Sequence, residues 1–497
     1  MPGYLRFNWV YLFWILLAIL AIQSVHAAEP VFPSKAPWLN VTRPLTSHDL
    51  RGHVVLLDFF TPGCINCIHV LPETEKLEHE FGKRLLIIGV NSPKFTASQQ
   101  TDNLKGFIER YDIHHPVITD KHMVLWNDYH VYAWPTQVLL GPDGKVVGLY
   151  VGEDKYAAIR QDVIQTLASA RKAGTLRHNL LPLNPISMPR HGLLQPGKLA
   201  VNSRYVAVSD SGHNRVILLD HRGRVIRVIG NGKRGMRNGT HAQAEFDGPQ
   251  GLAFTDNILY VADTGNALIR AIQLPEGKVS TVAGNGERGF ASMGEYPARQ
   301  VGLNSPWGLK VVGDNLYIAM AGIHQIWRLE LDNMQIGPYA GSGNEGITDG
   351  SLDEASFAQS SALAYHNNKL YVADPEASAI RQIDLISGEV TTLIGKGLFV
   401  FGMKNGADSH ALLQHDQGVT WYRHRLYIAD TFNNAIRVLN LESQRVSTLA
   451  TGLSQPGGLA VLNPQTLLVA DTNANRIAEV NLASGKVKTW TIKGLGV

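Results

Sequence analysis

The only two cysteines of this 497-residue chain lie three positions apart, as Cys64-Ile65-Asn66-Cys67. They follow an apolar run, Val54–Phe60, which has the character of a buried strand. A chain of this length with no further thiol has no cysteine left for structural cross-links, and the close spacing is typical of a redox pair. The sequence therefore predicts thiol–disulfide chemistry, with Cys64 and Cys67 forming a redox-active disulfide.

The positions of the two sulfurs give them different tasks. If a helix begins at the pair, Cys64 faces unpaired backbone N–H groups and the positive end of the helix dipole, which favour a thiolate nucleophile. Cys67, one turn later on the same face, is then shielded and placed to resolve a mixed disulfide. Asp58, buried on the preceding strand, is expected to have a raised pKa and to transfer protons near neutral pH.

Simpler interpretations stay open for each of these residues. The cysteines could form a metal site or be inert, although a single C-x-x-C pair lacks the second ligand pair of a structural zinc site. Asp58 could be a purely structural carboxylate, and His69 either lines the helix or tunes the cysteine pair. We expect neither a metal nor a cofactor.

The surrounding segment contains the elements that would position these residues. Apolar runs, helical spacing and a glycine-rich turn at 141–144 predict strands alternating with helices, and hence an α/β domain. The predicted elements, in chain order, are the strand Val54–Phe60, the helix Leu71–Phe81, the strand Leu85–Val90, the helix Asn103–Tyr111, the hairpin Val138–Val147 and the helix Lys155–Ala173.

This domain resembles the thioredoxin family at three positions besides the cysteines. Asp58 lies six residues before Cys64, where the family has a buried carboxylate, and Pro72 lies five residues after Cys67, where it has a helix-kinking proline. Pro135 precedes the predicted hairpin, at the place of the family's cis-proline loop. The resemblance implies that Pro135 faces the disulfide and shapes the substrate groove.

The cysteine turn departs from the usual thioredoxin pattern. The family usually has Trp before the first cysteine and Gly-Pro between the two, whereas here Gly63 precedes the pair and Ile65-Asn66 separate it. Because the intervening dipeptide strongly affects the reduction potential, the sequence does not indicate the direction of electron transfer. The stretch from Thr61 to Pro72 instead looks like the thioredoxin domain of the NHL-repeat-containing protein 2 family.

The first thirty residues have the pattern of an export signal. Arg6 precedes an apolar core from Trp9 to Ile22, and Val25-His26-Ala27 offers a small-residue cleavage site. The core is shorter than the roughly 20 residues of a membrane span, so we expect a cleaved signal over residues 1–27, with an uncleaved N-terminal anchor as the alternative. Export places the cysteines in the periplasm or a similar compartment, where disulfides persist.

The second half of the chain is self-similar. Its units open on a Gly-Leu-Ala-like strand and close on a Val-Ser-Thr-like strand, and four short strands in roughly 40 to 55 residues are typical of propeller blades. The units resemble NHL repeats. We therefore expect a six-bladed β-propeller over residues 196–497, after a linker or closing strand over residues 174–195. The central strands of the six units end at Asp210, Asp263, Met320, Asp374, Asp430 and Asp471.

Most repeated polar residues of this half have a structural interpretation. A strand-ending Asp can accept backbone N–H groups of the following turn, and the Arg after it can pair with a neighbouring acid. Glycine-rich loops such as Gly230–Gly235 open no helix, so they are interpreted as turns between blades. Blade three has Met320 where the other blades have Asp, and this departure reflects either sequence drift or a function of that blade. The histidines lack metal-ligand spacing; they are His213, His241, His324, His366, His410, His415 and His424.

The two halves together predict a fold and a function. The expected fold is an α/β thioredoxin-like domain, residues 30–173, followed by an all-β six-bladed propeller, an order that resembles the NHL-repeat-containing protein 2 family in an exported, bacterial-type form. The resemblance implies a thiol–disulfide oxidoreductase that acts on thiol or disulfide proteins, with a membrane thiol donor as reductant and the propeller as docking platform.

Two alternative functions belong to other classes. The propeller could be a binding scaffold whose cysteines are non-catalytic or regulatory, or it could be a metal-dependent hydrolase or lyase. The net charge of +3 is too small to indicate a nucleic-acid partner.

Overall fold

The computed structural model describes residues 32–33, 35–177, 181–186, 192–291 and 293–495. They form two compact units. The first comprises the chain up to residue 60 together with 72–92 and 115–184; the second comprises 61–71, 93–114 and the chain from 185 onward. The predicted signal at 1–27 lies outside the described residues. Within the described ranges, no helix is both long and apolar enough to cross a membrane.

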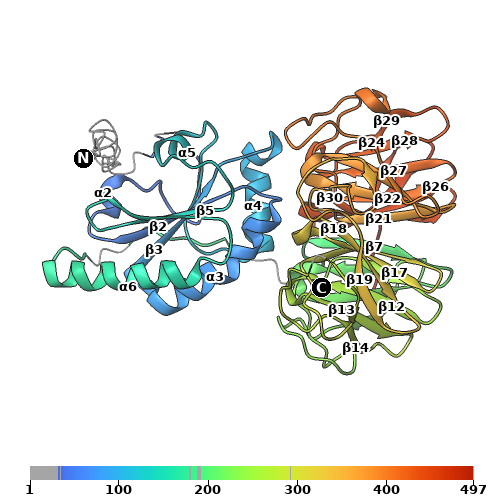
Figure 1. Ribbon diagram of the computed structural model, residues 1–497, viewed down its shortest axis with the longest axis horizontal. Coiled ribbons are helices and arrows are strands. Elements are labelled where there is room, and N and C mark those ends of the chain that lie inside the picture. The colour runs from blue at the N-terminus through green and yellow to red at the C-terminus, as the bar shows by residue number, and fades with distance from the viewer. Residues whose placement is uncertain (1–31, 34, 178–180, 187–191, 292, 496–497) are drawn as a thin grey trace, which may run out of the picture. The chain divides into compact units, whose positions relative to one another are not determined.

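The first unit is built on a six-stranded mixed sheet with the strand order β1-β4-β3-β2-β5-β6 (Figure 1). The strands β2, β3 and β4 run parallel, and the other neighbours are antiparallel. This is the predicted α/β arrangement. The strands are β1 (Trp38–Leu39), β2 (Val54–Phe60), β3 (Leu85–Asn91), β4 (Val117–Thr119), β5 (Thr136–Leu140) and β6 (Val146–Val151).

Both faces of this sheet are covered by helices. Val54 and Leu56 of β2 pack on one face against the end of α3 (Ile65–Phe81) and against α6 (Tyr156–Ala173). The alternate residues of β2 pack on the other face against α2 (Ser47–Leu50) and α5 (Val124–Asp128). Burial on both faces explains why β2 and β3 are continuous apolar runs rather than alternating ones.

The predicted elements are confirmed with shifted ends. The helix predicted from Leu71 begins six residues earlier at Ile65, because it is continuous with the cysteine turn and contains Pro72. The predicted hairpin is β5 and β6, which are paired antiparallel. The helix predicted at 103–111 is α4 (Thr101–Arg110), which belongs to the second unit.

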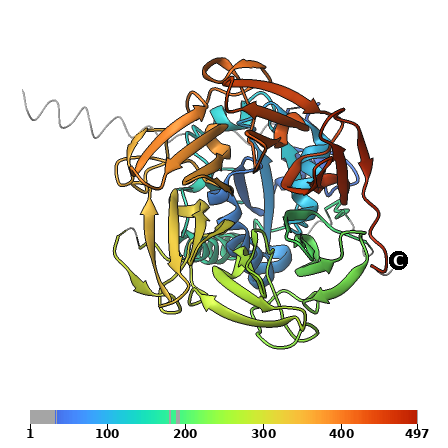
Figure 2. The same ribbon diagram turned by 90° about the vertical axis from the view of Figure 1, so that its right-hand side faces the viewer.

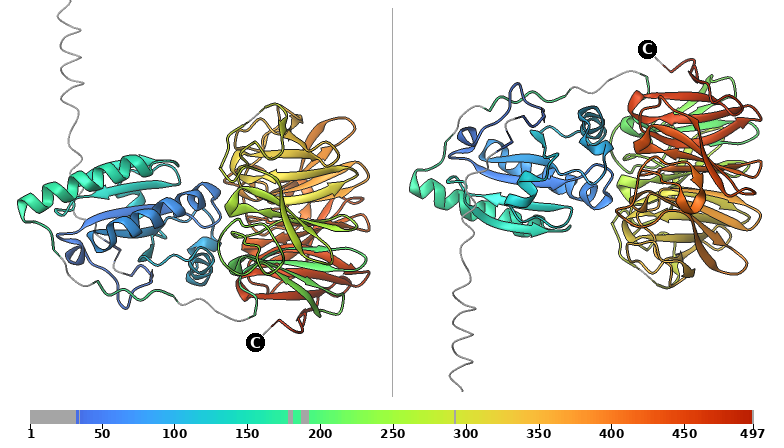
Figure 3. Two further views of the ribbon diagram at one scale, coloured as in Figure 1. Left: turned by 90° about the horizontal axis from the view of Figure 1, so that it is seen from below. Right: turned by 90° about the horizontal axis from the view of Figure 1, so that it is seen from above.

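The second unit contains six antiparallel sheets of four or five strands, arranged as a ring of blades (Figure 2). The first strand of each blade contacts the first strand of the next around the ring axis. Figure 3 shows the twisted blades from two opposite sides. These strands are β7 (Pro196–Val201), β11 (Leu252–Phe254), β16 (Pro306–Val312), β21 (Ala362–His366), β26 (Gly418–Tyr422) and β30 (Pro456–Asn463).

Each blade continues outward through three further strands, and a short extra strand joins the outer edge of blades three, four and five. The predicted turns between blades follow the outermost strands. The further strands are β8 (Val206–Asp210), β9 (Arg215–Leu219) and β10 (Val225–Ile229); β12 (Ile258–Asp263), β13 (Leu268–Gln273) and β14 (Lys278–Ala283); β17 (Asn315–Met320), β18 (Gln325–Glu330) and β19 (Gln335–Ala340) with β15 (Tyr296–Pro297); β22 (Lys369–Asp374), β23 (Ala379–Asp384) and β24 (Glu389–Ile394) with β20 (Gly350–Ser351); β27 (Arg425–Asp430), β28 (Ala435–Asn440) and β29 (Arg445–Ala450) with β25 (Gly406–Ala407); and β31 (Thr466–Asp471), β32 (Arg476–Asn481) and β33 (Val487–Thr489).

The repeated Asp and Arg residues form ion pairs in five of the six blades. Asp263 and Arg270 form a fully buried ion pair of 2.6 Å, as predicted. The expectation that the Asp accepts backbone N–H groups of the following turn is wrong: at Asp263 that turn contributes the side-chain N–H of Asn266, at 2.9 Å. Asp263 Oδ1 accepts the N–H of Asp247, 16 residues earlier, in the loop that precedes the inner strand. The carboxylate therefore ties a blade to the loop that enters it.

Blade three replaces this ion pair with apolar residues. Met320 and Trp327 occupy the positions of Asp263 and Arg270, and both are fully buried. Such a replacement is tolerated because well-packed apolar side chains can stabilise a core as well as a buried ion pair does.

The ring closes between its first and last blades. Thr472 Oγ1 donates a hydrogen bond of 2.9 Å to the carbonyl of Pro196, and the N–H of Val225 donates one of 2.9 Å to the carbonyl of Lys493. Of the predicted linker or closing strand at 174–195, the described part up to residue 184 belongs to the first unit, where Leu183 bridges Val41. That part therefore pairs with the α/β unit and with no blade.

Candidate functional site

The cysteine pair stands at the beginning of α3, as predicted. Cys64 directly precedes the helix, and its carbonyl accepts the N–H of Ile68 at 3.2 Å. The N–H of Cys67 donates a hydrogen bond of 3.3 Å to the Cys64 Sγ, and the two sulfurs are not joined in a disulfide. A backbone donor aimed at this sulfur, at the positive end of a helix, stabilises negative charge on it.

Both sulfur-bearing residues are buried, which the sequence predicted for Cys67 alone. Cys64 is 6% exposed and Cys67 is 3% exposed. Beside the two cysteines, Ile65 and Ile68 pack in one apolar cluster with Trp307 and Ala321 of the propeller. The turn that carries the nucleophile is thus covered by residues more than 200 positions later in the chain.

The turn before the cysteines is tightly packed as well. Gly63 has a φ of +98°, a conformation that L side chains rarely adopt, and a Cβ there would meet His415 Cε1 at 2.6 Å. His69 Nε2 lies 2.6 Å from Ser305 Oγ, so this histidine, which the sequence left between a lining and a tuning role, makes a specific polar contact with the propeller.

Asp58 lies in the middle of β2, opposite Gln137 of β5 and beside Gly89 of β3. It is 3% exposed. Burial raises the pKa of Asp58 to about 6, while His115 and a hydrogen bond from Gln137 oppose the shift and Glu78 adds to it. The predicted raised pKa therefore agrees with its environment, and a carboxyl group of this kind can exchange a proton near neutral pH.

The polar groups around Asp58 were not identified from the sequence. His115 Nδ1 lies 3.1 Å from Glu78 Oε1, and both influence the Asp58 carboxyl. Gln137 is 2% exposed in the otherwise apolar strand β5. A glutamine in a strand expected to be buried could have indicated a polar partner for Asp58, because buried polar groups need hydrogen-bond partners.

Pro135 precedes β5 and is preceded by a cis peptide bond after Trp134, as the resemblance implied. Its carbonyl accepts the N–H of Gly152 at 2.9 Å. Trp134 Nε1 donates a hydrogen bond of 2.9 Å to the carbonyl of Ser92. These contacts hold the loop within the first unit.

The four predicted catalytic residues are divided between the units. Cys64 and Cys67 lie together in the second unit, and Asp58 and Pro135 lie in the first. Among the described residues, no group of three or more His, Cys, Asp or Glu side chains is arranged to hold a metal ion.

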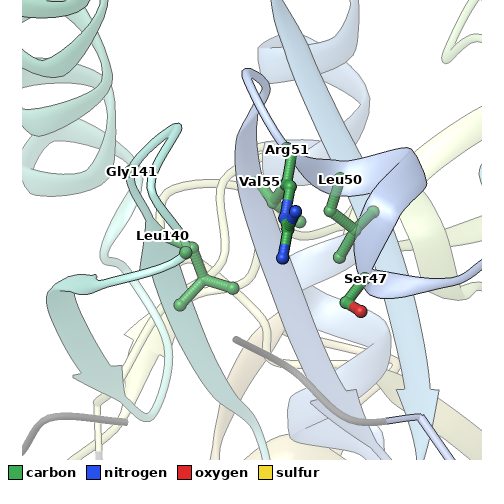
Figure 4. Close-up of a pocket in the computed structure, with 7 residues that line it drawn as sticks. Ser47, Leu50, Arg51, Val55, Leu140 and Gly141 are labelled. Atoms are coloured by element: carbon green, nitrogen blue, oxygen red, sulfur yellow. The ribbon is translucent and has the colours of Figure 1, made fainter. Parts of the chain in front are cut away.

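A small surface pocket lies in the first unit, away from these residues (Figure 4). It is lined by residues at the start of β2 and the end of β5, including Val55, Leu140 and Gly141, together with Leu50 of α2. Its polar lining side chains are Ser47 of α2 and Arg51, and none of the predicted site residues lines it.

Comparison with known proteins supports both halves of the fold. A thioredoxin-like family model matches residues 52–146. NHL repeat-containing protein 2 of Homo sapiens is 38% identical over 517 aligned residues, which cover 93% of this chain and 71% of the human protein. The chloroplastic protein SUPPRESSOR OF QUENCHING 1 of Arabidopsis thaliana is 36% identical, over 96% of this chain and 49% of its own length.

A shorter relative matches the first domain. Thiol-disulfide oxidoreductase ResA of Halalkalibacterium halodurans is 24% identical over 28% of this chain and 86% of its own length. The thioredoxin-like domain, the six blades and the identity over most of both chains together show that the protein belongs to the NHL repeat-containing protein 2 family.

Proposed function

We propose that this protein is an exported thiol–disulfide oxidoreductase whose propeller is a docking platform for partner proteins. The observation that supports this most directly is the hydrogen bond of 3.3 Å from the Cys67 N–H to the Cys64 Sγ at the start of α3. It supplies what an attacking thiolate needs, and it sets the second sulfur one helical turn away. The similarity of the first domain to a named thiol-disulfide oxidoreductase favours the same chemistry.

The exchange proceeds in two balanced steps. The Cys64 thiolate attacks a partner disulfide, a new S–S bond forms between Cys64 and the partner, and the other partner sulfur leaves as a thiolate. Cys67 then loses its proton and attacks the Cys64 sulfur. The partner leaves as a dithiol, and Cys64 and Cys67 are left oxidised as a disulfide. A thiol reductant, which we propose is a membrane dithiol donor, then reduces the Cys64–Cys67 disulfide again. When the protein oxidises a partner dithiol instead, the same steps run in reverse.

Two residues of the first unit serve these steps. Asp58 accepts the Cys67 proton, for which its pKa of about 6 is suited because acid and base forms are both available near neutral pH. Pro135, fixed at the start of β5, shapes the groove that receives the partner chain.

The proposal is tested by measuring disulfide exchange and the reduction potential on the full chain. Wild type should exchange with a protein disulfide, and Cys64→Ser should abolish the reaction. Cys67→Ser should stall at the mixed disulfide and so trap the partner covalently. Equal exchange by wild type and Cys64→Ser would refute the proposal.

Burial of both thiols favours one competing function, a propeller scaffold whose cysteines are not catalytic. This candidate predicts that partners bind the Cys64→Ser/Cys67→Ser protein as tightly as wild type and in both redox states. Redox-dependent binding, or covalent trapping by Cys67→Ser, excludes it.

Export is part of the proposal and rests on the N-terminal pattern of Arg6, the apolar core and the site at Ala27. N-terminal sequencing of the protein isolated from the extracytoplasmic fraction should find a chain that begins near residue 28. Recovery in the cytoplasm of a chain that retains residue 1 would contradict export.

A further inference from the structure

The propeller residues that contact segments 61–71 and 93–114 are concentrated at the ends of its blades. Six of them, which contact the cysteine turn or Lys94, are here called the cap: Ser305, Trp307, Ala321, Gln359, Glu376 and His415. All of these residues, and both segments, belong to the second unit.

The cap binds the cysteine turn through its backbone as well as its side chains. The N–H of Ile65, the first residue of α3, donates a hydrogen bond of 2.8 Å to Gln359 Oε1. The side chain of Ile65 packs against Trp307 and Ala321. A backbone N–H and an apolar surface beside the nucleophile are the groups that a partner chain would otherwise contact during exchange.

A second contact joins segment 93–114 to the cap. Lys94 Nζ and Glu376 Oε2 form an ion pair of 2.5 Å whose side chains are 6% and 4% exposed. Burial raises the pKa of Glu376, but the charges and hydrogen bonds of Lys94 and His415 together outweigh burial, and the net pKa falls to about 2. Lys94 also donates a hydrogen bond of 3.1 Å to the Glu376 carbonyl. A buried pair of this kind is costly to break, because either charge left alone is desolvated without compensation.

His415 connects the two contacts. Its ring lies against Gly63, beside the cysteine turn, and stacks on Phe432 with a centroid separation of 4.3 Å. Its Nδ1 lies 3.4 Å from Glu376 Oε1, the carboxylate that Lys94 binds. His415 therefore connects the Lys94–Glu376 pair by direct contacts to the wall of the cysteine turn.

The cap coincides with departures from the propeller's own repeat. Every blade has a three-residue turn after its second strand, and Ser211, Thr264, Thr431 and Thr472 begin that turn by donating a hydrogen bond to a proline carbonyl of the next blade. Blade three has Ala321 there and blade four has Pro375, followed by Glu376, where blades one to three have glycine. Blades three and four therefore lack the hydrogen bond that the other four blades make at this turn. The residues that stand there instead contact Ile65 in blade three and Lys94 in blade four.

We infer that the cap inhibits the redox site, because it occupies the surface of the cysteine turn to which a partner protein would bind. A docking partner must displace the cap before Cys64 reacts. The inference rests on the proposed exchange function and adds its regulation. The irregularity of blades three and four is explained by the cap.

The test is the rate at which iodoacetamide alkylates Cys64 in the reduced, full-length protein, followed by mass spectrometry of the peptide. Wild type should react at least about tenfold more slowly than the urea-unfolded chain, because Cys64 reacts only from a transiently open state. Lys94→Met should raise the native rate by about tenfold or more, since it leaves Glu376 without its cation. Lys105→Met, an exposed lysine of the same segment, is the matched control and should leave the rate unchanged.

A second variant keeps the test decisive if Lys94→Met does not fold. Gln359→Ala removes only the acceptor of the Ile65 N–H, and it should raise both the alkylation rate and the hydrogen exchange of that amide. A native Cys64 that reacts as fast as the unfolded chain would overturn the inference, as would folded Lys94→Met or Gln359→Ala proteins that match Lys105→Met.

Failure of the cap and failure of the exchange function are distinguishable. Alkylation reports access to Cys64 whether or not the protein exchanges disulfides. If the cap exists and the function is as proposed, Lys94→Met should also speed exchange with glutathione disulfide.

Discussion

Replacing Asp58 with asparagine should stabilise the first unit at neutral pH. The pKa of Asp58 rises from 3.8 to about 6, because burial penalises the carboxylate more than His115 and Gln137 relieve it. The folded state therefore keeps this proton up to about pH 6, whereas the unfolded chain releases it near pH 3.8. Asp58 thus makes stability fall as pH rises through that window. A shift of about 2 pKa units corresponds to roughly 3 kcal/mol once both states are ionised.

The sign and size of this effect define the assay. Asparagine has nearly the shape of a protonated Asp58 but never ionises, so the Asp58→Asn protein should match wild type at pH 4 and exceed it by roughly 3 kcal/mol at pH 7. Urea titrations read by pulsed hydrogen exchange of the peptide that spans β2 report the first unit alone. Asp128→Asn, an exposed carboxylate of the same unit, is the control and should show no such gain.

The same Asp58→Asn substitution should slow disulfide exchange, although it stabilises the fold. Without a proton acceptor the resolving step at Cys67 should slow by about a hundredfold at pH 7, within the usual range for losing a general base. A stability gain that is equal at pH 4 and pH 7 would refute the raised pKa. A gain confined to pH 7 with unchanged exchange would leave Asp58 a structural carboxylate.

Three further predictions concern packing. Arg437→Met should lower the propeller's unfolding free energy by roughly 3–5 kcal/mol, because it leaves the fully buried Asp430 without its partner; urea titration measures this, and a loss below 1 kcal/mol would contradict it. Thr472→Val should cost about 1 kcal/mol and raise the hydrogen exchange of β7 and β30, since it removes the bond to Pro196 that closes the ring; unchanged exchange there would contradict it. Gly63→Ala should destabilise the cysteine turn by about 1 kcal/mol or more and increase Cys64 alkylation, because alanine strains the positive φ and meets a neighbouring ring; an unchanged alkylation rate would contradict it.

The sequence predicted those features whose causes are local. The apolar run of β2, the helix that begins at the cysteine pair and the hairpin of β5 and β6 each follow from neighbouring residues. The six blades were predictable because the same strand pattern returns six times. The Asp–Arg pairs were expected too, since an Asp at the end of the second strand and an Arg in the third strand return in five of the six blades.

What the sequence did not reveal depends on contacts between distant segments. Ile65, next to Cys64, packs against Trp307 and Ala321, and no periodicity links these two residues to the cysteine turn. His415 was one of several scattered histidines, and only the fold places it against Gly63. The Asp263 carboxylate binds an N–H 16 residues upstream, because the loop into each blade runs past the end of its second strand.

Ring closure has a consequence for synthesis. The outer strand β10 of blade one pairs with β9 of the same blade and also donates the Val225 N–H to the carbonyl of Lys493, near the end of the chain. The inner strand β7 meets β30 and the turn at Thr472. On the ribosome, blade one therefore emerges almost 300 residues before the segment that seals it, with strand edges open to mispairing in the meantime. A nascent propeller of this kind needs a chaperone, or delayed folding, until its last blade has left the exit tunnel.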